Sequence, residues 1–176
     1  MTKKVLLIIA SKGFLPIEYH NTKKELEDAG YFVTTASDKS DKAISSDGKE
    51  VDVDLAISEV DPKSYDGIFI IGGPGTIEHL DNMETWQLFL KIDKAYQLYG
   101  AICIATRILA NVTNMLSGKY FTGWNSDNKL AEIADNVDGY YAEKDVVVDG
   151  NLITAAGPKT AKAFGQAIVT KFKNSF

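Results

Sequence analysis

The segment GAICIATRIL, residues 100–109, contains Cys103, the only cysteine in the 176-residue chain. An apolar β-rich run spans this residue and a helical pattern begins near Thr106, which predicts a strand-to-helix corner. The N-terminus of a helix favours a thiolate, and its free N–H groups can hold a developing oxyanion. Free cysteine is also among the most buried residue types. Packing is therefore the alternative and, from the pattern alone, the more frequent outcome.

Glu18 is a candidate partner for the thiol because it follows the first apolar run, within the segment FLPIEYH. Pro16 stiffens this segment, and its apolar residues would desolvate the carboxyl group. A desolvated carboxyl group has a raised pKa and can donate a hydrogen bond while neutral. Alternatively, Glu18 belongs to the first turn of the next helix, where acidic residues are common.

The loop GGPGT, residues 72–76, also follows an apolar run directly. Its small residues allow backbone N–H groups to approach a ligand. The loop lacks the glycine spacing and the lysine of phosphate-binding motifs. A tight turn without function would have the same sequence.

The chain has two histidines, His20 and His79. His20 lies two residues after Glu18, a spacing that does not direct both side chains at one thiol in a regular helix or strand. Whether either histidine reaches Cys103 is open. Because the sequence has no H-x-x-x-H spacing and no second cysteine, we expect no metal site and no other cofactor.

The elements that must position these residues alternate between apolar β-rich runs and helical patterns. This order predicts an α/β sandwich with helices on both faces of a mostly parallel sheet. Sites in such sheets lie beyond the C-terminal ends of the strands, which would bring residues 11–20, residues 72–76 and Cys103 into one pocket. Strands are predicted over 4–10, 31–37, 65–73, 101–105 and 119–124, a subsidiary strand or hairpin over 47–60, a hairpin over 146–154, and helices over 22–30, 84–99, 106–116, 128–135 and 160–172.

Length and composition predict one globular domain spanning residues 1–176, with 45% hydrophobic and 24% charged residues. The net charge of -5 gives no reason to expect a nucleic acid partner. No apolar run approaches the roughly 18 residues of a membrane span. The run from Val5 to Ala10 is too short for a secretory signal, and a single cysteine forms no internal disulfide, so we expect a cytoplasmic protein.

Over nearly its whole length the chain resembles the DJ-1/PfpI (ThiJ/PfpI, class I glutamine amidotransferase-like) superfamily. The resemblance implies a flavodoxin-like three-layer sandwich in which Cys103 is a nucleophile-elbow cysteine with a strained backbone, and in which Glu18 hydrogen-bonds its sulfur. It is carried, in order, by KVLLIIASKGFLPIEYHNTKKELEDAG, YDGIFIIGGPG, GAICIATRILANV and DVVVDGNLITAAGPKTAKAFGQAIV.

The resemblance also implies the surroundings of the thiol. Gly73 and the backbone N–H of Ile104 would form an oxyanion hole, and Tyr19 and Trp124 would line the pocket. Because an ionised Glu18 would repel a thiolate, we expect Glu18 to stay protonated while Cys103 ionises. The family resemblance further implies a homodimer.

Two positions depart from the family pattern. Protease-like relatives carry a histidine directly after the cysteine, where this chain has Ile104, and relatives of the DJ-1 type carry one where this chain has Trp124. Peptide hydrolysis needs a general base and an acid for the leaving amine. We therefore expect no peptidase activity.

Three functions fit the remaining groups. The first is an enzyme, glyoxalase- or hydratase-like, that acts on small reactive electrophiles through Cys103 and Glu18. The second is a sensor of oxidative stress, in which an oxidant converts the thiol to a sulfinate held by Glu18. The third is a non-catalytic binding homodimer that keeps the fold and loses the chemistry.

Overall fold

The computed structural model describes residues 2–174. Its centre is a seven-stranded sheet with the strand order β11-β12-β8-β7-β1-β3-β6. Neighbouring strands are parallel except β11 and β12, which form the predicted antiparallel hairpin. The strands are β1 (Lys4–Ile9), β3 (Phe32–Ser37), β6 (Leu55–Ala56), β7 (Gly67–Ile70), β8 (Leu98–Ile102), β11 (Val146–Asp149) and β12 (Leu152–Ala155).

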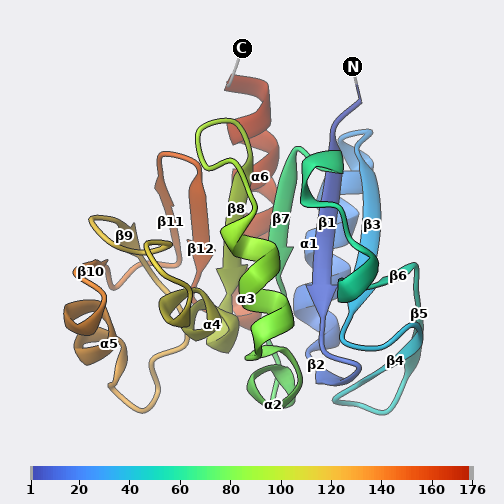
Figure 1. Cartoon of the computed structure of the whole chain (residues 1–176), viewed down its shortest axis with the longest axis horizontal. Helices are drawn as coiled ribbons and strands as arrows, with labels where there is room; N and C mark the ends of the chain where they lie inside the picture. Colours follow the sequence, from blue (N-terminus) through green and yellow to red (C-terminus); the bar gives the residue numbers. More distant parts are fainter. Residues whose placement is uncertain (1, 175–176) are drawn as a thin grey trace.

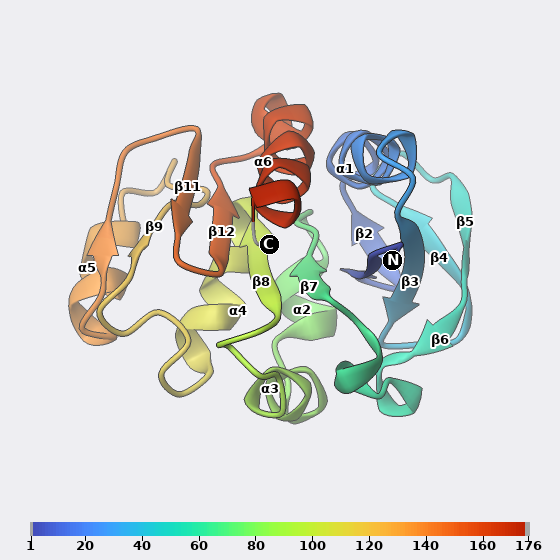
Figure 2. The same ribbon diagram turned by 90° about the horizontal axis from the view of Figure 1, so that it is seen from above.

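Helices cover both faces of the sheet, which confirms the predicted three-layer α/β architecture. Figure 2 shows α1 (Pro16–Asp28) and α6 (Ala161–Asn174) together on one face. On the other face lie α2 (Thr76–Leu80), α3 (Met83–Leu90) and α4 (Thr106–Asn111). Strands covered on both faces are apolar throughout, and β7 and β8 are buried at every position.

Smaller elements flank the sheet at its two ends (Figure 1). One end carries the three-stranded sheet of β2 (Lys12–Phe14), β4 (Asp41–Ser45) and β5 (Glu50–Val53), so the predicted 47–60 hairpin begins earlier than expected. The other end carries β9 (Tyr120–Phe121), α5 (Leu130–Asn136) and β10 (Tyr140–Tyr141). Single 3₁₀ turns cover Ile57–Glu59, Pro62–Ser64, Cys103–Ala105 and Pro158–Thr160.

The boundaries of three predicted helices were wrong. Helix α1 begins at Pro16 rather than at residue 22, because proline suits the first turn of a helix. Helix α3 ends at Leu90, and the side chain of Gln97 accepts a hydrogen bond from the Asp93 N–H at 2.6 Å to close the turn before β8. Helix α4 ends at Asn111 rather than at residue 116.

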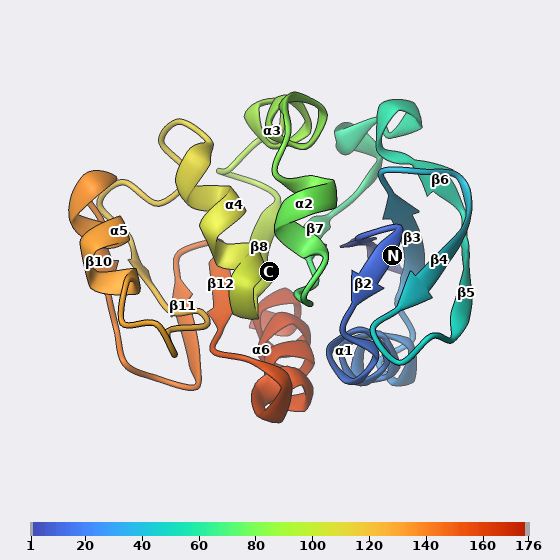
Figure 3. The same cartoon turned by 90° about the horizontal axis from the view of Figure 1, so that it is seen from below.

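The C-terminal ends of the parallel strands share one edge of the sheet, the lower edge in Figure 1 and the near side in Figure 3. The loops after β1, β7 and β8 all emerge there, as expected for sites in such sheets. Helix α2 lies beside β2 at this edge. Among residues 2–174, no helix combines the length and the apolar character needed to cross a membrane.

Candidate active site

Cys103 occupies a strained corner between β8 and α4. Its φ angle is 63°, in the left-handed region that residues other than glycine rarely adopt. Such a residue costs on the order of 1–3 kcal/mol and persists only where the surroundings enforce it. Two hydrogen bonds hold the backbone in this conformation. The Cys103 carbonyl oxygen accepts the N–H of Trp124 at 3.1 Å and the N–H of Thr106. The predicted elbow is confirmed.

Gly72 brings Cys103 and Glu18 together. Its N–H donates a hydrogen bond to Glu18 Oε2 at 2.9 Å. A Cβ atom at this position would lie 2.6 Å from Glu18 Oε2 and 2.7 Å from the Cβ of Cys103. Only a glycine therefore lets the carboxyl group and the thiol side chain approach each other across this loop.

Glu18 is the third residue of α1 and is fully buried. Glu18 therefore does lie in the first turn of a helix, which was the alternative considered above. From this turn its carboxyl group also points toward Cys103. Among residues 2–174, its Oε1 atom has no hydrogen-bond partner. Burial raises the pKa of Glu18 from 4.5 to about 7, although the Cys103 thiol and the Gly72 N–H oppose this shift. The carboxyl group therefore titrates near neutral pH.

The thiol of Cys103 is also buried, with 7% of the residue exposed. Burial and the charge of Glu18 raise the pKa of Cys103 to about 12, against the opposing effects of the Ile104 N–H and Arg107. These directions run against the expectation that Glu18 stays protonated while Cys103 ionises. Burial acts on both groups, and the charge of Glu18 further disfavours a thiolate beside it.

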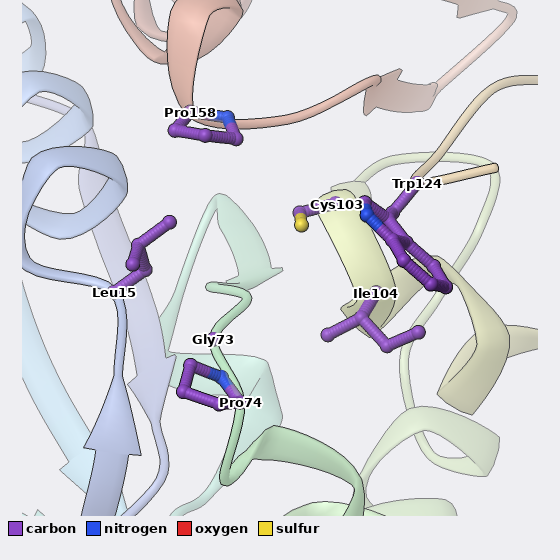
Figure 4. A pocket seen from close by; sticks show the side chains of 7 residues that line it. All are labelled: Leu15, Gly73, Pro74, Cys103, Ile104, Trp124 and Pro158. Carbon is purple, nitrogen blue, oxygen red and sulfur yellow. The ribbon is translucent and has the colours of Figure 1, made fainter. Parts of the chain in front are cut away.

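A cavity of about 370 Å³ opens onto the sulfur. In Figure 4 the sulfur points into the space between Leu15, Gly73 and Pro158, and the Trp124 ring lies on the far side of the elbow, beside Ile104. The size is at the lower end of the range for ligand pockets, and the lining side chains are uncharged. They belong to Leu15, Gly73, Pro74, Cys103, Ile104, Trp124 and Pro158.

Three predicted site residues, Gly73, Ile104 and Trp124, line the same cavity as Cys103. Gly73 has a φ angle of 146°, and a Cβ atom there would collide with the backbone of the loop after β1. The cavity also contains residues that were not predicted individually from the sequence. Leu15 and Pro74 lie within the two loops predicted to form the pocket, but Pro158 comes from the Gly-Pro turn before α6.

Tyr19 is not a wall of this cavity, which corrects the prediction. Its hydroxyl group lies 2.7 Å from Thr35 Oγ1, and its ring packs edge-on against Phe14 with 5.5 Å between the ring centroids. Consecutive residues of a helix point about 100° apart. Since Glu18 faces the elbow, Tyr19 faces β3 instead.

The two histidines do not line the cavity. His20 is exposed on α1. His79 Nδ1 lies 3.3 Å from Asp38 Oδ2 and 3.5 Å from Ser11 Oγ. Within residues 2–174, His, Cys, Asp and Glu side chains form no group of three that could hold a metal ion.

Comparisons with known proteins agree with this geometry. The sequence model of the DJ-1/PfpI family matches residues 3–171. An uncharacterised protein of Staphylococcus aureus (strain Mu50) is 32% identical over 177 residues, covering 98% of this chain and 100% of the relative. An uncharacterised protein of Methanocaldococcus jannaschii is 30% identical over 167 residues, covering 94% of this chain and 80% of the relative.

Solved structures show the same fold. The ThiJ/PfpI domain protein from Brachyspira murdochii has a TM-score of 0.90 at 28% identity and covers 99% of this chain and 98% of its own. Drosophila melanogaster DJ-1beta has a TM-score of 0.85 at 28% identity and covers 97% of this chain and 90% of its own. Since the family model spans almost the whole chain and its members share this sheet, the chain belongs to the DJ-1/PfpI family.

Proposed function

We propose that the protein is an enzyme in which the Cys103 thiol adds to a small uncharged electrophile and Glu18 moves the proton. α-Oxoaldehydes and isocyanides are suitable substrates, which gives glyoxalase- or hydratase-like activity. One observation carries the proposal: a buried carboxyl group and a strained cysteine meet across Gly72, where a small apolar cavity opens onto the sulfur.

Glu18 suits the role of general base. Such a base works best when its pKa is close to the working pH, and burial raises that of Glu18 to about 7. As the carboxylate takes the thiol proton, the sulfur becomes nucleophilic without having to exist as a free buried thiolate. The high pKa of Cys103 is then compatible with catalysis.

The proton balance is simple for both substrates. With an aldehyde, the S–C bond forms, the π pair of the C=O bond moves to the oxygen, and Glu18 returns the thiol proton to that oxygen to give a hemithioacetal. With an isocyanide, the sulfur bonds to the terminal carbon and Glu18 delivers the proton to the same carbon, which gives a thioimidate that water can hydrolyse. Neither addition expels an amine, so neither needs the histidine that peptide hydrolysis requires.

Gly73 and Ile104 are the residues we assign to the developing negative charge. Both line the cavity that holds the sulfur, and the Ile104 N–H is directed at the sulfur, where it lowers the pKa of the thiol. Trp124 would hold the apolar part of the substrate against the elbow.

A sensor of oxidative stress is the second candidate. The unpartnered Glu18 Oε1 could share a hydrogen bond with an oxygen of a cysteine sulfinate. The raised pKa of Cys103 weighs against fast oxidation, because the thiolate is the form that reacts with peroxide. A non-catalytic binding role would leave the strained cysteine and the buried acid without a purpose.

The proposal is tested by the rate of Cys103 alkylation as a function of pH, in the native protein and in Glu18→Gln. The single cysteine makes the label unambiguous. We expect the native rate to rise through about pH 7 and Glu18→Gln to lose this rise and react only at alkaline pH. If both proteins stay unreactive up to alkaline pH, Cys103 is a packing residue and the proposal fails.

Turnover then separates the enzyme from the sensor. The reduced protein is incubated with phenylglyoxal or an aryl isocyanide in excess, with Cys103→Ser as the blank. Many turnovers per thiol support the enzyme. No turnover, together with rapid gain of two oxygen atoms in dilute peroxide by intact mass, would instead support the sensor.

A further inference from the structure

Arg107 is the only arginine in a chain that otherwise uses lysine for its positive charges. It is the second residue of α4, four residues after Cys103, and follows the 3₁₀ turn that begins at the elbow. Its side chain is 18% exposed, so the guanidinium group is largely enclosed between α4 and the segment that follows β9. This residue is not part of the cavity lining.

The guanidinium group makes three contacts with one short segment. It stacks over the Trp124 ring, with 5.1 Å from Arg107 Cζ to the ring centroid. Its Nη2 atom lies 2.6 Å from Asp127 Oδ1 and donates to the Trp124 carbonyl oxygen at 3.4 Å. Asp127 Oδ1 also accepts the Lys129 N–H at 3.3 Å. Arg107 therefore connects the turn after the elbow to the cavity wall and to the start of α5.

The charge of Arg107 also reaches the thiol. Arg107 lowers the pKa of Cys103, opposite to the effect of Glu18. Both residues are largely enclosed by protein, with 18% of the Arg107 side chain and 7% of Cys103 exposed, so solvent screens this interaction only partly. Arginine remains protonated at every working pH, whereas a histidine in this place would not.

An arginine at this position carries a cost in the free energy of folding. Arg107 Nε is buried and has no hydrogen-bond partner in the described part of the chain, and an unsatisfied buried donor costs about 1–3 kcal/mol. A lysine would avoid this cost, but it lacks the planar group that stacks on an indole while it holds a carboxylate. Local costs of this kind are typical of functional sites.

We propose that Arg107 is a positioning residue of the active site, which braces the Trp124 wall and supplies a fixed positive charge near Cys103. The inference rests on the proposed reaction of Cys103. It assigns to one side chain two properties of the site: the placement of an aromatic wall and the electrostatic environment of the nucleophile.

The test compares Arg107→Met, Arg107→Lys and the native protein by the pH profile of Cys103 alkylation. In Arg107→Met the midpoint near pH 7 should stay, because Glu18 sets it. The plateau rate above it should fall about threefold to tenfold, the effect of half to one pKa unit at the sulfur. Arg107→Lys keeps the charge and should recover most of the rate. Lys162→Met, on the exposed side of α6, controls for the loss of one positive charge.

A second measurement follows the position of the Trp124 ring. With Trp86→Phe as background, acrylamide should quench Trp124 fluorescence more strongly in both Arg107 variants than in the parent. Asp127→Asn, at a partly exposed position, releases the guanidinium group from its carboxylate and should raise the plateau rate of alkylation. This variant tests the inference even if Arg107→Met fails to fold.

The outcomes separate the two proposals. If the native protein shows no rise in rate near pH 7, the proposed function fails and this inference falls with it. If the native rise is present but Arg107→Met, Lys162→Met and Asp127→Asn all match the native plateau rate, the inference alone is overturned. A rate loss equal in Arg107→Lys and Arg107→Met would also overturn the role of the charge.

Discussion

Two groups of polar side chains lie at the same edge of the central sheet, and they differ in how completely they are satisfied. At the end of β1 and β3, Asp38 accepts the N–H and the hydroxyl group of Ser11, each at 2.7 Å, and the hydroxyl group of Ser37 at 3.2 Å. His79 completes this group at 3.3 Å. At the end of β8, Cys103 is strained, and one oxygen of Glu18 finds no partner within the residues that the structure describes.

The comparison shows why the histidine of this edge is not the one that catalysis would use. The Asp38 group contains the residue types of a hydrolytic triad, but its hydrogen bonds tie the ends of β1, β3 and α2 together and no residue of it lines the cavity. The second group, Cys103 and Glu18, has fewer polar atoms, but it includes a strained backbone and lies beside a cavity. Unsatisfied groups beside a cavity are the better sign of chemistry.

Gly72→Ala should have the largest effect, because it places a methyl group between Cys103 and Glu18. The new Cβ would lie 2.6 Å from Glu18 Oε2 and 2.7 Å from the Cβ of Cys103. Displacement by about 1 Å can cost about 100-fold in rate, and overpacking costs about 1–3 kcal/mol of stability. Alkylation at pH 8 and thermal unfolding measure both losses.

Gly157→Ala is the matched control for this change. It lies next to Pro158 at the cavity and has extended backbone, and apart from its chain neighbours no described residue lies within 4 Å of where its new Cβ would stand. It should leave both the rate and the melting temperature close to native values. Equal losses in the two variants would show that the approach across Gly72 is not special.

Glu18→Gln should alter stability in a direction that depends on pH. Burial raises the pKa of Glu18 from 4.5 to about 7, so the folded state prefers the protonated form. Its contribution to the free energy of unfolding is present below about pH 4.5, falls as the pH rises to about 7, and stays low above that. At pH 8 the glutamine variant should be more stable by up to about 3 kcal/mol. At pH 5 the two proteins should be nearly equal.

Chemical denaturation at pH 5 and pH 8 measures this difference, with the exposed Glu132→Gln of α5 as the control. A native protein that is as stable as Glu18→Gln at pH 8 would mean that the buried carboxylate is compensated. The contrast between the two polar groups would then disappear.

Asp38→Asn should produce the opposite pattern: a loss of stability with little loss of reactivity. The carboxylate accepts a backbone N–H and two hydroxyl groups, and an amide replaces one of its oxygens by a donor. A hydrogen bond to a charged group contributes about 1.5–3 kcal/mol, so we expect a destabilisation of about that size. Cys103 alkylation in the folded variant should stay within about twofold of native. A loss of alkylation with stability intact would place the Asp38 group in the active site.

The contrast also explains how far the sequence could predict the site. The apolar runs that became β1, β7 and β8 are continuous, and each ends at glycine, serine or cysteine, so the shared edge and its three loops followed from the strand pattern. The family resemblance predicts Tyr19 as a pocket wall, but it does not fix the face of α1 on which this side chain lies. Tyr19 follows Glu18 on a helix that begins at Pro16, six residues before the predicted residue 22, and therefore faces β3.

Arg107 makes contacts that the sequence pattern could not predict. Its partner Asp127 is 20 residues away, across a turn whose path no periodicity reveals. The directions in which the pKa values of Glu18 and Cys103 shift were equally hidden, because they depend on how deeply each group is buried and on how the two groups face each other. Contacts set by backbone pattern were predictable, whereas contacts set by side-chain placement were not.

His79→Gln should have the smallest effect and is the most direct test of the comparison. The glutamine side chain can still contact Asp38 and Ser11, and the imidazole–carboxylate contact it removes is partly exposed, with 20% of the His79 side chain accessible. Such pairs contribute about 0–1 kcal/mol, so the melting temperature should fall slightly. The pH profile of Cys103 alkylation should not change, because the rise in rate near pH 7 follows the deprotonation of Glu18. If the rise in rate near pH 7 moves or disappears in His79→Gln, the Asp38 group is coupled to Cys103 across the sheet edge, and the two polar groups act as one site.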